Sequence, residues 1–201
     1  MERIIDITKI PALWTTCDKS QDRHEPMESM LKGLGISALK VSGPITTPYT
    51  IGVAKGYIEA LSNSKPPFII LEDDATLVFD SPDKVFKVPD NSDALYLGTS
   101  IYGRIQKRTT PGGVIAANAK EYMRVFNMLG FHAIIYLTEE YVEHVITLLR
   151  SFIDNPVGGC DDPVAETMWA YNVYSVKEPI FYQKDGRSDG ATRLPINILL
   201  T

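Results

Sequence analysis

The segment that most constrains this chain runs from Phe68 to Asp74 and reads Phe-Ile-Ile-Leu-Glu-Asp-Asp, an apolar strand-like run that ends in three consecutive acids. Adjacent carboxylates repel one another, so a folded protein that keeps three together usually holds a cation or several hydrogen-bond donors beside them. In open α/β sheets, ligands bind at the carboxyl ends of the strands, where these acids lie. A solvated acidic turn is the alternative. The apolar segments on both sides favour a ligand site.

Apolar periodicity predicts alternating strands and helices in the first part of the chain. Pro26 suits the first turn of the first helix, and Gly35 suits its C-terminal cap. The alternation favours a parallel sheet with helices on its faces. The expected strands and helices occupy, in order, residues 10–16, 27–34, 39–41, 51–61 and 68–71.

The pattern changes in the second part of the chain. Three strand-like segments follow one another closely, which favours antiparallel pairing and therefore a mixed sheet. Thr138 is a suitable N-cap for a helix that extends to Phe152, and a shorter helix is expected to begin near Asp161. The remaining expected elements are strands at 94–98, 122–129, 132–137, 173–176 and 180–183, a loop at 111–119 and a polar tail at 184–193.

Composition narrows the class of protein. With 201 residues, 44% of them hydrophobic, the chain can bury the core of one domain. A net charge of −5 gives no overall basic surface for nucleic acid or anionic membrane, and we interpret the basic run Arg104 to Arg108 as a solvated loop. Cys17 and Cys160 match no metal or redox spacing. The N-terminus lacks a signal-peptide pattern and no apolar stretch is long enough for a membrane span, so we expect a cytoplasmic protein.

The acids at 72–74 suit a hard divalent cation. Mg²⁺ and Mn²⁺ prefer carboxylate oxygens together with substrate phosphates, so one or two acids suffice when a diphosphate completes the coordination shell. In extended geometry Glu72 and Asp74 point to the same side and Asp73 to the other. We therefore predict Asp74 and Glu72 as metal ligands, with Asp73 beside a nucleotide's ribose or bonded to backbone donors.

A second acidic pair, Asp161 and Asp162, precedes Pro163. One of the two suits the N-cap of a helix, and the other could serve as general base on an acceptor hydroxyl. His132 is either a buried structural histidine or a contact to a diphosphate. Asp22 and Arg23 follow the first long strand, where Arg23 could bind phosphates through both of its terminal nitrogens or form an ordinary exposed pair.

These pieces, in this order, resemble glycosyltransferase family 25, which includes bacterial lipooligosaccharide galactosyltransferases and collagen galactosyltransferase domains. The resemblance spans nearly the whole chain, through short motifs. One departure is that the family commonly has Gly-x-x-x-Ser-His before the acidic motif, whereas here Gly52 is followed by Val-Ala-Lys-Gly-Tyr. Either Lys55 replaces a polar group near the donor, or the pocket differs from that of the family. The matching stretches are Asp22-Arg23, Leu34 to Ile36, Ile51-Gly52, Ile70 to Ala75, Asp93 to Gly98, His132-Ala133, Pro156 to Asp162 and Pro179 to Gln183 with Ser188-Asp189.

The resemblance implies a GT-A-like three-layer α/β sandwich, with a mixed, mostly parallel sheet and helices on both faces. It implies a single glycosyltransferase domain over residues 1–201, in which 1–100 binds the nucleotide-sugar and 101–201 forms the acceptor side. Gln183, Ser188 and Asp189 join the donor-binding residues by this resemblance, and Ser188-Asp189 could fold over the ligand.

The expected activity is metal-dependent, inverting transfer of a hexose from a UDP-sugar to a hydroxyl, with Mn²⁺ or Mg²⁺ as cofactor. The acceptor could be a surface glycan, a hydroxylysine-type side chain or a hydroxylated base in nucleic acid, and the acidic net charge disfavours the last. Two alternatives stay open. A non-catalytic glycan- or nucleotide-binding module would keep the fold without turnover, and a receiver-like signalling domain would need regular strand–helix alternation to its end.

Overall fold

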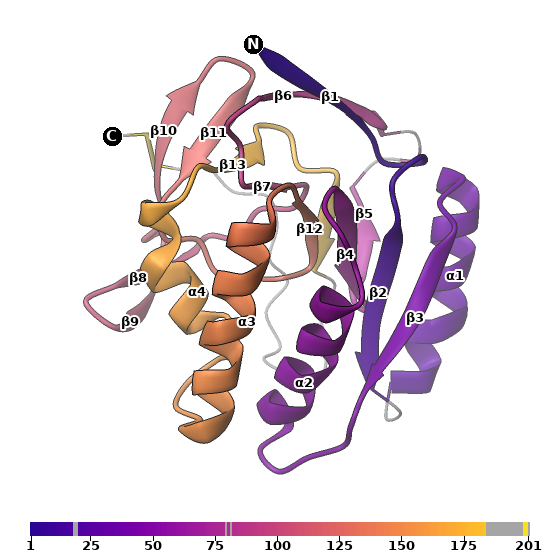
Figure 1. Cartoon of the computed structure of the whole chain (residues 1–201), viewed down its shortest axis with the longest axis vertical. Coiled ribbons are helices and arrows are strands. Elements are labelled where there is room, and N and C mark those ends of the chain that lie inside the picture. Colours follow the sequence, from indigo (N-terminus) through magenta and orange to yellow (C-terminus); the bar gives the residue numbers. More distant parts are fainter. Residues whose placement is uncertain (18–19, 79, 81, 184–198, 201) are drawn as a thin grey trace.

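The computed structural model describes residues 1–17, 20–78, 80, 82–183 and 199–200 (Figure 1). A nine-stranded sheet forms its centre, in the order β15-β10-β11-β13-β7-β12-β4-β2-β3. The predicted α/β sandwich with a mixed sheet is therefore confirmed. The strands of this sheet are β2 (Ala12–Cys17), β3 (Ala38–Gly43), β4 (Phe68–Glu72), β7 (Ala94–Tyr96), β10 (Ile115–Ala119), β11 (Tyr122–Val125), β12 (Ala133–Tyr136), β13 (Val173–Val176) and β15 (Leu199–Leu200).

Strand direction explains why the sheet is mixed and still mostly parallel. Seven of the nine described strands run one way, and β11 and β12 run against them. β12 enters between β4 and β7 and is antiparallel to both. A receiver-like domain needs regular alternation of parallel strands and helices to its end, so these reversed strands exclude that alternative.

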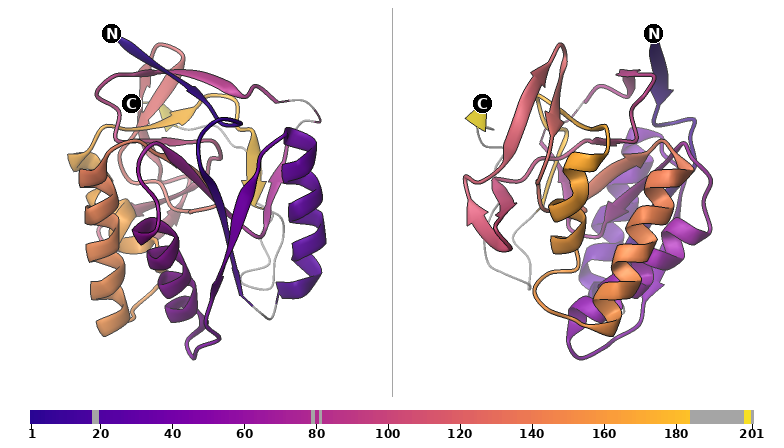
Figure 2. Two further views of the ribbon diagram at one scale, coloured as in Figure 1. Left: turned by 45° about the vertical axis from the view of Figure 1, so that its right-hand side comes forward. Right: turned by 60° about the vertical axis from the view of Figure 1, so that its left-hand side comes forward.

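The sheet separates two hydrophobic cores, and strand residues alternate between them with period two. Leu13 and Ile70 belong to the core under the later helices, whereas Trp14 and Leu71 belong to the core under the first helix. Figure 2 shows α1 (Gln21–Leu34) on one side of the sheet and α2 (Tyr49–Ser62) with α3 (Glu139–Asp154) on the other. A fourth helix, α4 (Asp162–Thr167), continues into a 3-10 turn at Met168–Ala170 on the α3 side. Helices on both faces are thus confirmed.

The ends of α1 and α3 follow the predicted signals with one exception. Gly35 caps α1 in the left-handed conformation, with φ +74°, and its N–H reaches the carbonyls of Leu31 and Lys32. Thr138 caps α3 through its hydroxyl, which accepts a hydrogen bond from the Tyr141 N–H. Pro26 lies inside α1 rather than in its first turn, because that helix begins at Gln21.

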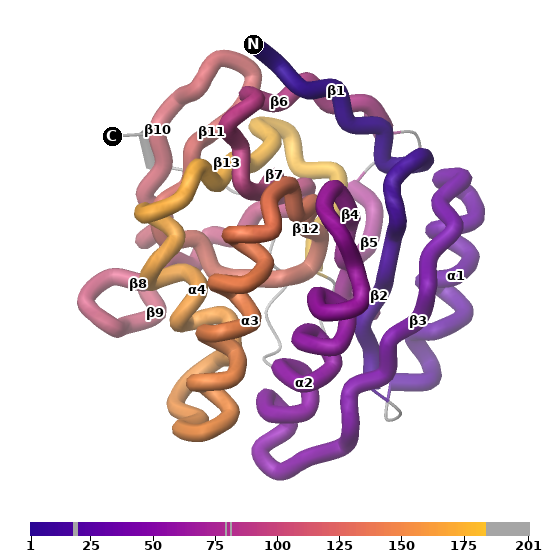
Figure 3. Tube along the Cα trace, in the orientation of Figure 1, coloured from indigo at the N-terminus to yellow at the C-terminus, as the bar shows by residue number. Residues whose placement is uncertain are grey.

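Several short strands lie outside the main sheet. Figure 3 traces β1 beside β6, which pair as an antiparallel arm although they are far apart in the sequence. The expected loop at 111–119 was wrong in part, because residues 115–119 form β10. These additional strands are β1 (Glu2–Asp6), β5 (Ala75–Leu77), β6 (Val85–Pro89), β8 (Tyr102–Ile105), β9 (Arg108–Pro111) and β14 (Phe181–Gln183).

The basic run around Arg104 corrects the sequence analysis in part. β8 and β9 form a hairpin whose turn residues Gln106 and Lys107 have positive φ, and Lys107 and Arg108 are exposed as predicted. Arg104 is 12% exposed and points back into the molecule, where it forms ion pairs with residues of α4. Among the helices in the described part of the chain, none has the length and apolarity needed to cross a membrane.

Candidate active site

A cavity of about 350 Å³ lies at the carboxyl ends of β2 and β4. In Figure 1 this is the lower end of β2, near the start of α1, and the position agrees with the rule for ligands in open α/β sheets. The walls come from segments far apart in the chain. The lining residues are Thr15, Thr16, Cys17, Ser20, Arg23, Tyr49, Thr50, Val53, Gly56, Glu72, Asp73, Asp74, Gly130, Phe131, Gly159, Cys160, Asp161 and Gln183.

Arg23, on the first turns of α1, joins the two aspartates that follow β4. Its Nη1 atom lies 2.7 Å from Oδ1 of Asp73 and 3.5 Å from Oδ2 of Asp74. Thr16, near the end of β2, donates from its hydroxyl to the other oxygen of Asp73 at 2.6 Å, and His24 lies 3.0 Å from the same hydroxyl. The parallel pairing of β2 with β4 brings these groups together at one sheet edge.

Asp74 has a different environment from Asp73. Gln183 donates from Nε2 to Oδ2 of Asp74 at 3.0 Å, so β14 contributes a side chain to the cavity wall. The Asp74 side chain is 9% exposed, and its Oδ1 finds no hydrogen-bond partner among the described residues. Burial raises the pKa of Asp74, Asp73 adds to the rise, and Gln183 and Arg23 oppose it.

Glu72 lines the same cavity from the last position of β4. β4 ends at Glu72 and a turn follows, so the strand alternation used to predict a common side stops before Asp73 and Asp74. Glu72 follows Ile70 on the α2 side, where its charge raises the pKa of Tyr57 after the larger effect of burial. Strand alternation therefore does not place Glu72 and Asp74 on one side, although both residues line the cavity. Among the described residues, no three His, Cys, Asp or Glu side chains converge as a metal group.

Asp161 and Asp162 lie in different environments. Asp161 stands at the N-cap position of α4 but makes no side-chain cap bond; its Oδ2 accepts from the Gly130 N–H at 2.8 Å, and the residue lines the cavity. Asp162 is buried and does not line the cavity. Its Oδ2 accepts from the Gly159 N–H at 3.1 Å and lies 3.2 Å from Nη1 of Arg104. Of the two predicted catalytic aspartates, Asp161 is the one in the cavity wall.

Arg104 and two glycines determine the position of the loop that carries Asp161. Arg104 also reaches Oε1 of Glu166, at 3.1 Å from Nε and 2.7 Å from Nη2. A Cβ atom at Gly159 would lie 2.5 Å from Oδ1 of Asp161, and one at Gly158 would lie 2.2 Å from Oδ2 of Asp162. The loop therefore wraps both carboxylates so closely that side chains at these positions would collide with them.

Close backbone contacts place α2 beside the cavity. A Cβ atom at Gly43, the last residue of β3, would lie 2.4 Å from the carbonyl oxygen of Gly52, and one at Gly56 would lie 2.9 Å from the Cα of Gly43. Only glycine fits these positions, so the helix packs directly on the strand. The same helix presents Val53 and Gly56 to the cavity.

The remaining predicted residues lie elsewhere. Lys55 is exposed on α2 and Asp22 is exposed at the start of α1, and neither lines the cavity. His132 is 1% exposed, and its ring packs so closely on Gly98 that a Cβ there would lie 2.0 Å from its Nε2; it is a buried residue outside the cavity wall. Ser188 and Asp189 lie outside the described residues.

Sequence reasoning missed several wall residues. Thr15, Thr16 and Cys17 end β2, and their place could have been found from the rule that parallel neighbours bring their carboxyl ends to one edge. Gly130 and Gly159 carry no comparable local signal, because they reach the cavity through contacts made between distant segments.

The sequence matches no known family model and no curated protein. Among solved structures, the chain is similar to a CTP:phosphocholine cytidylyltransferase from Streptococcus pneumoniae, with 10% sequence identity, a TM-score of 0.40, and coverage of 89% of this chain and 74% of that one. A likeness at this level assigns neither a family nor an activity, so the resemblance to glycosyltransferase family 25 stays an expectation.

Proposed function

We propose that the cavity binds a nucleotide-sugar, a UDP-hexose, together with Mn²⁺ or Mg²⁺, and that the protein transfers the hexose to an acceptor hydroxyl with inversion. One observation carries the proposal. Asp74 is nine-tenths buried in the wall of a cavity at the carboxyl ends of β2 and β4, and its Oδ1 has no hydrogen-bond partner among the described residues. Such an oxygen suits a cation.

The charge of the walls supports a cation as well. Among the described lining residues, Arg23 is the one cationic side chain, against the carboxylates of Glu72, Asp73, Asp74 and Asp161. A diphosphate entering alone would meet net repulsion. The donor set consists of hard oxygen atoms, which fits Mg²⁺ or Mn²⁺. Asp73 and Asp74 would hold the cation, which when bound would neutralise charge on the departing diphosphate.

Asp161 is the proposed general base. Its carboxylate is held by the Gly130 N–H in the cavity wall, and it comes from a different element from the β4 acids. A carboxylate in this role accepts the proton of the acceptor hydroxyl as that oxygen attacks the sugar. Asp162 has a positioning role in this proposal, because its carboxylate is engaged by Arg104 and Gly159.

The other walls suit the organic part of the donor. Tyr49, Thr50 and Val53 line the cavity from α2, and Phe131 lines it from the segment before β12. Apolar and aromatic walls with a few polar groups are typical of small-molecule sites, and the cavity volume of about 350 Å³ lies in their usual range. These groups could contact a nucleobase and a sugar, whereas Arg23 could contact phosphates.

The first test measures thermal unfolding with UDP-, GDP-, ADP- and CMP-sugars, each with and without Mn²⁺. A ligand at about 100 times its dissociation constant stabilises the fold by about 2.7 kcal/mol. We expect stabilisation by UDP-hexoses only when Mn²⁺ is present, and its loss in Asp74→Asn. Asp90→Asn is the matched control, because it changes charge equally at a carboxylate on the β1–β6 arm. Stabilisation that persists in Asp74→Asn would contradict the metal assignment.

Turnover separates a transferase from a non-catalytic module of the same fold. Release of UDP from the stabilising donor would be followed with glycans, hydroxylysine peptides and hydroxylated nucleic acid as acceptors. The proposal expects release that depends on both metal and acceptor. Tight donor binding with no release for any of the three acceptor classes would favour the binding module instead.

A further inference from the structure

The Arg23 guanidinium stands where a cation between Asp73 and Asp74 would stand. One nitrogen, Nη1, contacts both carboxylates, at 2.7 Å and 3.5 Å. The side chain is 20% exposed and lines the cavity. The two acids are adjacent in the sequence and nine-tenths buried, so without a positive charge between them they would repel each other strongly.

Arg23 and its neighbours fill the hydrogen-bonding positions of the two carboxylates unequally. On Asp73, one oxygen accepts from Arg23 and the other from the Thr16 hydroxyl. On Asp74, Gln183 and Arg23 both approach Oδ2, and Oδ1 finds no partner in the described part of the chain. A divalent cation could contact both oxygens of Asp74, whereas the guanidinium as placed reaches only one.

We propose that Arg23 is a resident counter-ion, which a divalent cation displaces from Asp73 and Asp74 and which then moves to the phosphates of the donor. The inference rests on the proposed function. A guanidinium binds phosphate oxygens through two parallel hydrogen bonds, so the arriving donor provides a new partner for Arg23 at the moment its old partners are taken.

Cooperative binding follows from this exchange. The cation alone must displace Arg23 with no new partner for the guanidinium, and the nucleotide alone meets a cavity with excess negative charge. When both bind, the cation occupies Asp73 and Asp74 and the diphosphate receives the displaced guanidinium, so each strengthens the binding of the other by the same factor. Removal of the guanidinium should open the cation site and remove most of this coupling.

The test measures Mn²⁺ affinity by the electron paramagnetic resonance signal of free Mn²⁺, with and without UDP. We expect UDP to tighten Mn²⁺ binding at least about tenfold in the wild-type protein, within the usual range of coupling. In Arg23→Gln, Mn²⁺ without UDP should bind at least about tenfold more tightly than in the wild type, and the effect of UDP should nearly vanish.

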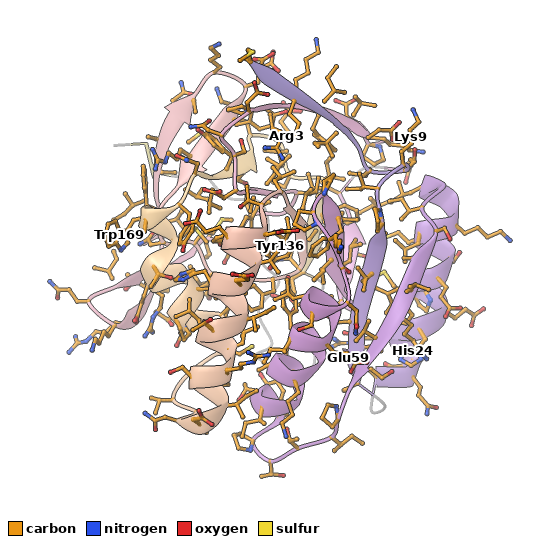
Figure 4. The ribbon with its side chains drawn as sticks, in the orientation of Figure 1. Arg3, Lys9, His24, Glu59, Tyr136 and Trp169 are labelled. Carbon is orange, nitrogen blue, oxygen red and sulfur yellow. The ribbon has the colours of Figure 1, made fainter. Side chains whose placement is uncertain are left out.

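Arg3→Gln is the matched control. It removes the same charge from a partly buried arginine on β1 that hydrogen-bonds the carbonyls of Leu137 and Asp90. Figure 4 shows Arg3 at the opposite end of the molecule from His24, which lies near the cavity. This variant should bind Mn²⁺ as the wild type does. Arg23→Lys serves if Arg23→Gln does not fold; it keeps the charge without the fork, so UDP coupling should fall while Mn²⁺ alone stays weak.

Each result separates this inference from the proposed function. Unchanged or weaker Mn²⁺ binding in Arg23→Gln overturns the counter-ion role, even if the protein proves to be a transferase. Tighter Mn²⁺ binding in Arg23→Gln supports the role, even if no donor is turned over. Wild-type coupling in Arg23→Lys overturns the transfer of Arg23 to phosphate. No Mn²⁺ binding by any form, with or without UDP, overturns both.

Discussion

Two clusters of one arginine and two acids stand beside the cavity, and they differ in completeness. In the Arg23 cluster, formed by Arg23, Asp73 and Asp74, the arginine lines the cavity and one carboxylate oxygen has no partner among the described residues. In the Arg104 cluster, formed by Arg104, Asp162 and Glu166, the arginine is 12% exposed and none of the three lines the cavity.

The same residue types support two different roles in these clusters. Arg104 uses Nε, Nη1 and Nη2 on its two acids, and Asn127 hydrogen-bonds its backbone carbonyl, so the cluster fixes the loop that carries Asp161. Arg23 uses one nitrogen on both of its acids. Arg104, with all three of its nitrogens engaged, is suited to hold a loop in place. Arg23 engages one nitrogen beside a cavity and is suited to exchange its partners.

The greatest loss of activity should come from a substitution of Asp161, the residue whose loop the Arg104 cluster holds. Asp161→Asn should lower sugar transfer by about 10²–10⁴, the usual contribution of a general base, while metal-dependent donor binding stays unchanged. Steady-state rates and donor-induced thermal shifts would be measured on the same samples. Loss of donor binding, or transfer within a few-fold of wild type, would contradict the assignment.

Arg104→Gln should lower the free energy of unfolding, and Mn²⁺ should not restore it. It leaves Asp162 buried without its counter-ion, and since Glu166 is 33% exposed, we expect a loss of about 2–3 kcal/mol, at the low end for a broken buried pair. Urea unfolding with and without Mn²⁺ would measure it. Arg23→Gln is the comparison, because Mn²⁺ should recover its lost stability; equal recovery in both variants would remove the distinction between the clusters.

A threonine hydroxyl lies beside each cluster and hydrogen-bonds one of its members. Thr16 donates to the buried Asp73 carboxylate, so Thr16→Val should cost about 1.5–3 kcal/mol, the usual contribution of a hydrogen bond to a charged group. Thr109 is exposed, accepts from Nη1 of Arg104 and also hydrogen-bonds the Asp162 carboxylate; because water can replace its hydroxyl, Thr109→Val should cost less than about 0.5 kcal/mol. Chemical unfolding of both variants would measure the two losses in the free energy of unfolding and their ratio. Equal costs would mean that burial does not separate the two bonds.

The smallest effect concerns the two cysteines, which line the same cavity from different elements. Burial raises the pKa of the Cys160 thiol well above its usual value, and the negative charges of Asp161 and Glu72 raise it further. Cys17 is partly exposed. A maleimide should therefore label Cys17 first, with Cys17→Ser and Cys160→Ser used to assign the rates by mass spectrometry. Faster labelling of Cys160 would show that its loop opens.

Much of the fold was predictable, because periodicity and caps are local signals. The strand at 68–72, the helix from Thr138 and the Gly35 cap all depend on residues close in sequence. The strand end at residues 72–74 and the position of Arg23 after the first long strand pointed to one sheet edge, the family resemblance added Gln183, and the cavity is lined by Arg23, Asp73, Asp74 and Gln183.

The errors have a common physical cause. The basic run at Arg104 looks solvated until its partners, far along the chain at Asp162 and Glu166, are known. The predicted common side for Glu72 and Asp74 assumed that β4 continues, but the strand ends at Glu72. His132 is buried by contact with Gly98, a residue distant in sequence. Contacts of this kind leave no trace in local patterns.

The way the cavity is assembled also bears on synthesis of the chain. Its described walls begin at Thr15 and end at Gln183, so a nascent chain that has left the ribosome only as far as Phe131 lacks the Gly159–Asp161 wall and Gln183. Donor binding should therefore appear late in translation. A chain that ends before Gly159 also lacks β13, which lies between β11 and β7, so it should not bind the proposed donor.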